Sequence, residues 1–399
     1  MSETLLGGID SFSKETSILN QFLFPAPKSS YTWASFRGKI ICVVGREANF
    51  VPCMLIPGES TKSTAEKKQH ASCLAIYCHA NGEDIGILHE AGKWISDHLG
   101  VHVMIPEYPG YGMAPGQPNE LSVNRNIRAA YEFAVHALQW DPSHILFVGR
   151  SIGTGPAVRL AAEVRCGGLI LISPYTSVRD MVRRHAGTLT SWLTADLINL
   201  FPSEETIPFV RCPLLIVHGS NDKIIPAEHA MKLYSAAQMD DKKLVLIEGL
   251  GHHGLDLHLA VAQEAPQLFG LNDNPRALNL DKYLRDSSLH RKSVASPVPV
   301  YDVRFKSWSL PAVPPDQSPY LLEEEDRSTE ISKKILSDEV FRDHLLGGKH
   351  VDAQNVSHHI APDLDAEKQE GTEFFVTDSS GKVVSTPKLQ ATPSKLFVY

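Results

Sequence analysis

The chain has 399 residues, of which 43% are hydrophobic and 21% charged, as is typical of a globular protein large enough to bury a sizeable core. Its formal net charge of -8 argues against a nucleic-acid-binding surface and against broad attraction to anionic membranes. The six cysteines are scattered and none forms a Cys-x-x-Cys pair, so we expect reduced thiols and a cytoplasmic protein. The segment Met1 to Ser13 lacks the pattern of a signal peptide, and no apolar run approaches the ~20 residues of a membrane span.

Composition divides the chain into three parts. Residues 1–36 form a mixed N-terminal segment with an apolar cluster, for which packing on the domain is favoured over an interfacial membrane anchor. The cluster consists of Leu19, Phe22, Leu23 and Phe24. Residues 37–270 alternate between apolar runs and helix-like segments, and Pro, Ser, Asp, Glu and Lys dominate residues 271–399, which we expect to be a largely disordered tail.

The middle part predicts an α/β fold. Its apolar runs, rich in β-branched residues, predict strands at 40–44, 51–56, 74–78, 101–105, 145–148, 169–172, 214–217 and 244–247. Helix-like spacing of apolar residues predicts helices at 86–99, 121–138, 151–164, 227–237 and 255–268. Alternation of the two predicts one mostly parallel, eight-stranded sheet with helices on both faces, in which the first two strands form a hairpin.

Two stretches of the tail carry weak structural patterns. Residues 329–346 have apolar positions compatible with an amphipathic helix, and residues 374–385 are compatible with a hairpin around Ser380-Gly381. The Pro-rich stretch 298–315 holds single aromatic residues, and we expect it to bury too little surface to order.

A serine lies at the junction of a predicted strand and a predicted helix. The stretch Gly149-Arg150-Ser151-Ile152-Gly153 has the form Gly-x-Ser-x-Gly, which in this context is typical of a nucleophile elbow. The sharp turn forces Ser151 into a strained conformation, and the glycines remove side chains that would collide with neighbouring backbone. Ser151 is therefore the candidate nucleophile.

A serine hydroxyl needs a base and a group that orients the base. Asp222 follows the predicted strand 214–217, and His252 and His253 follow the strand 244–247, so the order along the chain is serine, acid, histidine. We take Asp222 as the acid and His252 as the base, because Gly251 lets the loop bend its ring towards Ser151; His253 is the alternative base.

An acyl-transfer site also needs donors for the oxyanion. The backbone amide of Ile152 is one candidate, and the loop His79-Ala80-Asn81-Gly82-Glu83 after the third strand supplies the other, for which we choose Asn81. We interpret His79 itself as a structural histidine that binds the loop. No set of residues has the spacing of a metal site, the His358-His359 pair included, and we expect no metal and no cofactor.

These motifs resemble family 17 of the α/β-hydrolase-domain-containing proteins, within the serine aminopeptidase-like hydrolases. The stretch from His79 to Gly86 resembles the family's His-Gly-Asn-Ala loop, with Ala80 in place of a glycine, and Tyr108-Pro109-Gly110-Tyr111-Gly112 resembles its Tyr-Ser-Gly-Tyr-Gly segment. The resemblance covers about residues 31–269. It implies the α/β-hydrolase fold, a triad of Ser151, Asp222 and His252, and hydrolysis of palmitoyl thioesters on membrane-associated proteins.

The sequence thus predicts a serine hydrolase that cleaves an ester or thioester through an acyl-enzyme. Its expected partners are an acyl ester or thioester, with an acylated protein as the leading substrate, and peripheral contact with a membrane. An aminopeptidase-like or small-ester hydrolase is the alternative within the enzyme class, and a non-catalytic scaffold is the alternative outside it. Residues 175–210 lie where lids are often inserted, but we favour packing on the sheet over an acyl groove.

Overall fold

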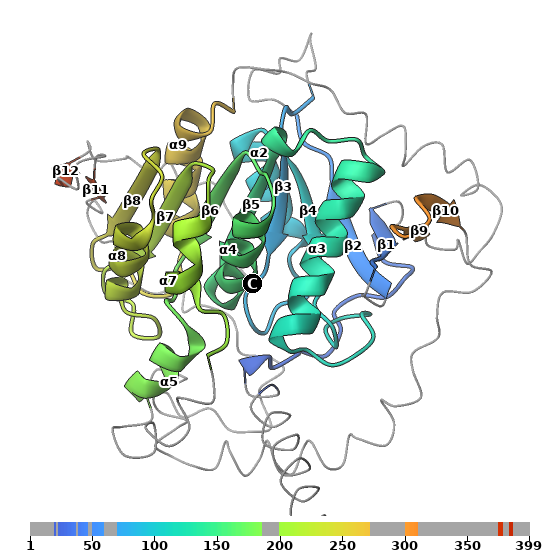
Figure 1. Cartoon of the computed structure of the whole chain (residues 1–399), viewed down its shortest axis with the longest axis horizontal. Helices are drawn as coiled ribbons and strands as arrows, with labels where there is room; N and C mark the ends of the chain where they lie inside the picture. The colour runs from blue at the N-terminus through green and yellow to red at the C-terminus, as the bar shows by residue number, and fades with distance from the viewer. Residues whose placement is uncertain are drawn as a thin grey trace, which may run out of the picture.

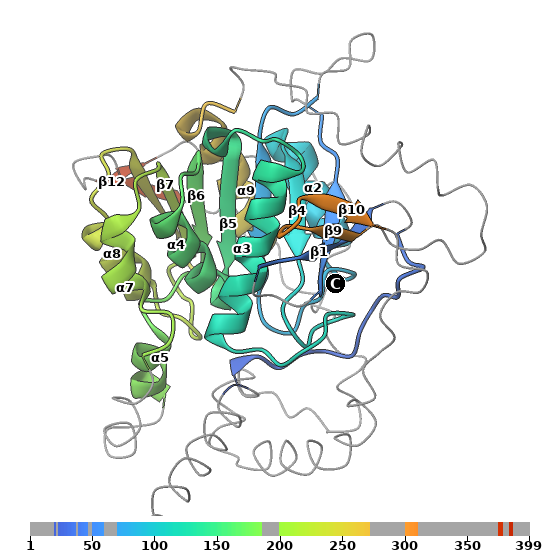
Figure 2. The same ribbon diagram turned by 45° about the vertical axis from the view of Figure 1, so that its right-hand side comes forward.

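The computed structural model describes residues 20, 23–36, 39–46, 50–59, 70–185, 199–271, 300–309, 374–377 and 383–385. Within these ranges, twelve strands form one sheet in the order β10-β9-β1-β2-β4-β3-β5-β6-β7-β8-β11-β12. The sheet runs through the middle of the molecule, and helices cover it on both sides (Figures 1 and 2).

The central eight strands match the eight-stranded prediction. They are β1 (Ile40–Val44), β2 (Phe50–Ile56), β3 (Leu74–Cys78), β4 (His102–Pro106), β5 (Ile145–Arg150), β6 (Gly168–Ile172), β7 (Leu214–Gly219) and β8 (Lys242–Ile247). β2 pairs antiparallel with β1 and with β4, and the pairs from β4 through β3, β5, β6 and β7 to β8 are all parallel. Because parallel strands point the same way, the carboxyl ends of β3, β5, β7 and β8 lie at one edge of the sheet.

Two layers of helices bury the two faces of the sheet. The helices α3 (Glu120–His136), α4 (Thr154–Glu163) and α8 (Ala227–Ala236) share one hydrophobic core with the sheet, and α2 (His89–Leu99) and α9 (Leu255–Leu268) share the other. Burial on both faces explains why the strands are continuous apolar runs. Short helices complete the connections: η1 (Pro142–His144), η2 (Ser151–Gly153), α5 (Val178–His185), α7 (Ser203–Thr206) and η3 (Ile207–Phe209). None of the described helices is long and apolar enough to cross a membrane.

The tail contributes strands to both edges of the sheet. β9 (Val300–Asp302) pairs parallel with β1 and antiparallel with β10 (Ser307–Ser309). The expectation that the stretch 298–315 buries too little surface to order was wrong for its described residues, 300–309, since Val300 and Tyr301 are buried against the sheet. Residues 300–309 order because β9 pairs with the edge strand β1 and packs on a core that the rest of the domain already forms.

The hairpin predicted in residues 374–385 is confirmed. β11 (Phe374–Thr377) pairs antiparallel with β12 (Val383–Ser385) and also with β8. The helix predicted at 329–346 lies outside the described residues.

Several described apolar residues of the N-terminal segment and of the stretch 175–210 are packed, although Phe209 is exposed. Phe24 of the N-terminal cluster is buried, and its ring meets that of Phe201 edge-on at 6.2 Å between centroids. Leu200 also packs against the core. Leu19 and Phe22 lie outside the described residues, as does most of the apolar run predicted within 175–210.

Candidate active site

Ser151 occupies a strained turn between β5 and α4. Its φ of 52° lies in the left-handed region, which non-glycine residues rarely adopt. The flanking glycines are required by close backbone approach: a Cβ on Gly153 would lie 2.1 Å from the main-chain oxygen of Cys78, and one on Gly149 would lie 2.6 Å from that of Gly153. The local geometry is therefore that of a nucleophile elbow, and the half-buried Ser151 sits at its apex.

Three side chains distant in sequence meet at this elbow. The Nε2 atom of His252 lies 3.0 Å from the Oγ atom of Ser151, and its Nδ1 atom lies 2.7 Å from Oδ2 of Asp222. Asp222 and His252 come from the loops after β7 and β8, so the parallel sheet brings them to the edge where Ser151 emerges. We call Ser151, His252 and Asp222 the relay group.

The Asp222 carboxylate is held from several sides. Its Oδ1 atom accepts the main-chain N–H groups of Ile224 at 2.9 Å and Ile225 at 2.8 Å, and its Oδ2 atom is also 3.3 Å from Nε2 of His218. Burial alone would raise the pKa of Asp222, but the hydrogen bonds from His218 and His252 outweigh it and hold the pKa well below its usual range. Asp222 is therefore ionised at neutral pH. No sequence pattern indicated this role for His218.

The two loops expected to supply oxyanion donors lie side by side. Cys78 of β3 is paired in register with Gly149 of β5, so the loop holding Asn81 begins beside the elbow. Among the described residues, no protein acceptor takes the main-chain N–H of Asn81 or of Ile152. The Asn81 side chain is engaged elsewhere, because Nδ2 donates to the oxygen of Leu23 at 2.7 Å. The main-chain N–H of Asn81, which no described protein group accepts, is therefore the candidate donor to an oxyanion.

His253 does not contact the relay group through a hydrogen bond; it contacts Arg150. The Nη2 atom of Arg150 donates to Nδ1 of His253 at 3.0 Å, and its Nη1 atom lies 2.5 Å from Oε1 of Glu83. Burial, with added repulsion from His252 and Arg150, lowers the pKa of His253 to about 4, so its Nδ1 remains an acceptor at neutral pH. Glu83 also accepts the N–H of Ala80 at 3.1 Å. These contacts join the loops after β3 and β8 to the end of β5. Glu83 and Arg150 both lie within the sequence motifs, but no role was predicted for either.

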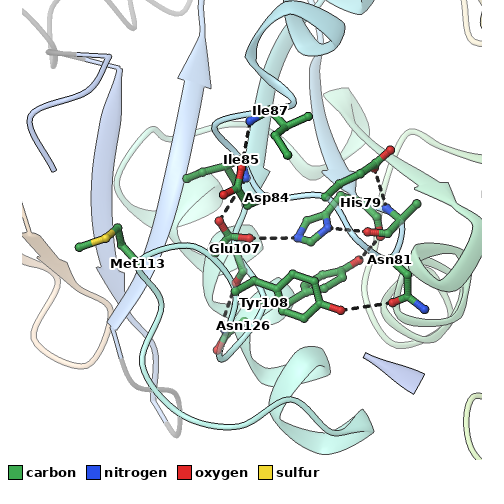
Figure 3. A network of polar contacts seen from close by, with 12 residues as sticks. His79, Asn81, Asp84, Ile85, Ile87, Glu107, Tyr108, Met113 and Asn126 are labelled. Atoms are coloured by element: carbon green, nitrogen blue, oxygen red, sulfur yellow. Dashed lines mark hydrogen bonds and ion pairs between the residues drawn. The ribbon is translucent and has the colours of Figure 1, made fainter. Parts of the chain in front are cut away.

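His79 is fully buried at the start of the loop that carries Asn81, and its ring faces Glu107 (Figure 3). Its Nδ1 atom is 3.0 Å from the oxygen of Ala80, and its Nε2 atom is 3.2 Å from Oε1 of Glu107. This placement agrees with a structural histidine. Among the described residues no group of three or more His, Cys, Asp or Glu side chains is arranged to hold a metal ion; His358 and His359 lie outside those residues.

Comparisons with known proteins agree with the α/β-hydrolase fold. The family model for serine aminopeptidases of type S33 matches residues 203–256, the stretch that holds Asp222 and His252. The α/β-hydrolase domain-containing protein aho-3 of Caenorhabditis elegans is 29% identical over 61% of this chain and 75% of its own length. The chain belongs to the α/β-hydrolase superfamily. Within this superfamily it resembles family 17: protein 17B of Xenopus tropicalis is 29% identical over 47% of this chain and 63% of its own length.

A solved α/β serine hydrolase of Xanthomonas campestris aligns with 59% of this α/β-hydrolase chain and 96% of its own length, with a TM-score of 0.43 and 17% identity. The chain spans less than two thirds of the frog protein 17B. This similarity therefore supports the superfamily, but it does not assign the activity of protein 17B to this chain.

Proposed function

We propose that this α/β-hydrolase is a serine hydrolase that cleaves an ester or thioester through an acyl-enzyme on Ser151. The observation that supports it is the position of His252, whose two ring nitrogens reach the Ser151 hydroxyl at 3.0 Å and the Asp222 carboxylate at 2.7 Å. A neutral imidazole held in this way can accept the serine proton while the carboxylate stabilises the resulting cation.

The first half of the reaction forms the acyl-enzyme. The Ser151 oxygen attacks the carbonyl carbon, and its proton passes to Nε2 of His252. The carbonyl oxygen gains the negative charge, and the N–H groups of Ile152 and Asn81 are the proposed donors to it. Collapse of the tetrahedral intermediate breaks the bond to the alcohol or thiol, which leaves with the proton from His252.

The second half repeats these steps with water as the nucleophile. His252 takes a proton from water, the hydroxide attacks the acyl carbon, and the proton then returns to Ser151 as the carboxylic acid leaves. Asp222 keeps Nδ1 of His252 protonated and the ring oriented throughout, and Asp222 itself stays ionised.

For the substrate we propose a fatty-acyl thioester on a protein at a membrane surface, met by a cytoplasmic enzyme in peripheral contact with the membrane. The resemblance to family 17 supports this choice. A second candidate is an aminopeptidase-like or small-ester hydrolase, which the match to the serine aminopeptidase model at residues 203–256 favours. A chain-length series of acyl esters and acyl thioesters separates the two, because turnover rising with acyl length supports the first and a preference for short esters supports the second.

Labelling with a fluorophosphonate probe tests the enzyme class itself. We expect the wild type and Ser235→Ala, which removes an exposed hydroxyl from α8, to be labelled. Ser151→Ala should not be labelled, and its turnover should fall by about 10⁶-fold if the relay group acts as a unit. An unlabelled wild type would favour a non-catalytic scaffold, and labelling that persists in Ser151→Ala would place the nucleophile elsewhere.

A further inference from the structure

The segment after β4 lies directly against the loop after β3, and the proposed mechanism gives it no task. Residues 79–85, which we call the oxyanion loop, carry Asn81. Residues 107–111 carry Glu107 and Tyr108, and Figure 3 shows the Glu107 carboxylate beside the His79 ring and the Tyr108 ring against it. β3 and β4 are parallel neighbours, so these two segments leave the sheet at the same edge.

Tyr108 fixes the start of the oxyanion loop. Its hydroxyl donates to the main-chain oxygen of His79 at 2.8 Å, and its ring stacks on the His79 ring at 3.8 Å between centroids. Tyr108 has no solvent-exposed surface, so its ring has little freedom to move. The carbonyl it binds lies two residues before Asn81, and the hydroxyl therefore restrains the peptide that leads to the proposed donor.

Glu107 binds the oxyanion loop at both ends. Its Oε1 atom lies 3.2 Å from Nε2 of His79, and its Oε2 atom accepts the main-chain N–H of Ile85 at 3.1 Å. The hydroxyl of Tyr31 donates to the same Oε2 atom at 3.1 Å. The carboxylate has no exposed surface. Burying a charge is costly, and a buried ion pair adds little net stability compared with an apolar pair. What this pair provides is a defined position for the loop.

A second tyrosine of the segment reaches Asn81 itself. The hydroxyl of Tyr111 donates to Oδ1 of Asn81 at 3.3 Å, while Nδ2 of Asn81 donates to the oxygen of Leu23. Both ends of the Asn81 amide are thereby occupied, and the residue is held in one orientation with its main-chain N–H left without a protein acceptor among the described residues.

We propose that Tyr108 and Glu107 are positioning residues that hold the oxyanion loop so that the main-chain N–H of Asn81 meets the developing oxyanion. This inference rests on the proposed function. Donors to an oxyanion are effective because they are fixed before the charge forms, and a loop that is free to shift loses that advantage.

The test is Tyr108→Phe, which removes one hydroxyl and keeps the ring. Loss of a whole oxyanion donor costs about 10²- to 10³-fold in kcat, so a displaced donor should cost about 10- to 100-fold. We expect kcat for an acyl ester to fall by that factor while KM changes less than twofold. Inhibition by a trifluoromethyl ketone, which forms a tetrahedral adduct on the serine, should weaken by the same factor as kcat.

Tyr131→Phe is the matched control. The Tyr131 hydroxyl also donates to a main-chain oxygen, that of Arg165 at 2.9 Å, and it does so away from the oxyanion loop. Both variants should lose similar thermal stability, but only Tyr108→Phe should lose kcat and inhibitor affinity together. If Tyr108→Phe does not fold, Glu107→Gln, which removes the charge facing His79, is measured in the same way and must show the same joint loss.

Unchanged kcat in folded Tyr108→Phe, or a rise in KM without loss of inhibitor affinity, would overturn the inference and leave the proposed function standing. If the wild type turns over no more substrate than Ser151→Ala does, the proposed function is refuted, and the inference falls with it.

Discussion

Arg150 donates a hydrogen bond from Nη2 to Nδ1 of His253 over 3.0 Å, and this contact distinguishes the two adjacent histidines of the loop after β8. His253 serves as an acceptor for the arginine that precedes the nucleophile. His252, one residue earlier, lies within 3.0 Å of the Ser151 hydroxyl. Adjacent residues of the same type therefore have different neighbours, and we expect their replacement to have different effects.

The first prediction compares the two histidines. His252→Gln removes the proposed base, and kcat should fall by about 10⁶-fold, as for other members of such a unit. His253→Gln keeps a side-chain acceptor for Arg150, and its kcat should stay within about 10-fold, since a shifted loop costs less than a missing base. Turnover of an activated ester by both purified variants measures this. Comparable losses in the two variants would contradict the assignment of His252 as the base.

The second prediction concerns the protonation of His253. Its pKa is lowered to about 4, so between that pH and the usual histidine pKa of about 6.5 the unfolded chain binds a proton that the folded chain does not. The free energy of unfolding should therefore rise with pH across this window, and above the window His253 should add no further pH dependence. The ring resonances of His253, followed by NMR, should titrate well below pH 6. The pH dependence of stability in His253→Gln should be flatter between pH 4 and 6.5 than in the wild type.

Arg150→Met supplies the control for that titration. Arg150 is one of three causes of the lowered pKa, after burial and His252, so its removal should raise the His253 midpoint part of the way towards the ordinary value. A midpoint near 6.5 in the wild type would show that His253 is not held as a neutral acceptor.

Local patterns were sufficient to predict the elements that carry the relay group. The run before Gly149 is apolar on both faces, and the sequence after it suits a helix, so the strand, turn and helix around Ser151 follow from residues close in sequence. Asp222 and His252 follow successive predicted strands, so both were predicted to lie at the edge of the sheet where those parallel strands end. The structure places their side chains within hydrogen-bonding distance of one another and of Ser151.

Other contacts between distant residues, which no motif order indicates, were not predicted, and the reason is physical. Glu83 and Arg150 are 67 residues apart, and nothing near either residue in sequence indicates that they pair. The same holds for Glu107 and His79, whose contact depends on β3 and β4 becoming neighbours. β9 was missed for a related reason: three residues are too few to show a period, and they form a strand because the edge of β1 is open.

The third prediction uses two glycines of the site. A Cβ on Gly153 would lie 2.1 Å from the oxygen of Cys78, so Gly153→Ala must displace β3 or the elbow. We expect a loss of about 2 to 4 kcal/mol in the free energy of unfolding, together with loss of probe labelling at Ser151. Gly251→Ala is the control. The structure does not require the glycine that was expected to let this loop bend, because its φ is not positive and its Cβ would meet nothing within 4 Å. The stability of this variant should stay within about 0.5 kcal/mol of the wild type. Equal stability of the two variants in urea would contradict the close approach at Gly153.

The fourth prediction tests whether the tail segment with β9 is part of the folded domain. Tyr301 is 2% exposed, and its ring meets that of Phe133 on α3 edge-on at 5.2 Å between centroids. Phe305, four residues later, is 73% exposed. Tyr301→Ala should therefore lower the free energy of unfolding by about 3 kcal/mol, as expected for removal of a buried aromatic ring. Phe305→Ala should change it by less than about 0.5 kcal/mol. Urea unfolding of the full chain, followed by the fluorescence of the core tryptophans, gives both values. If the two alanine variants unfold at the same urea concentration as the wild type, the segment does not contribute to the core, and the edge of β1 must be covered in another way.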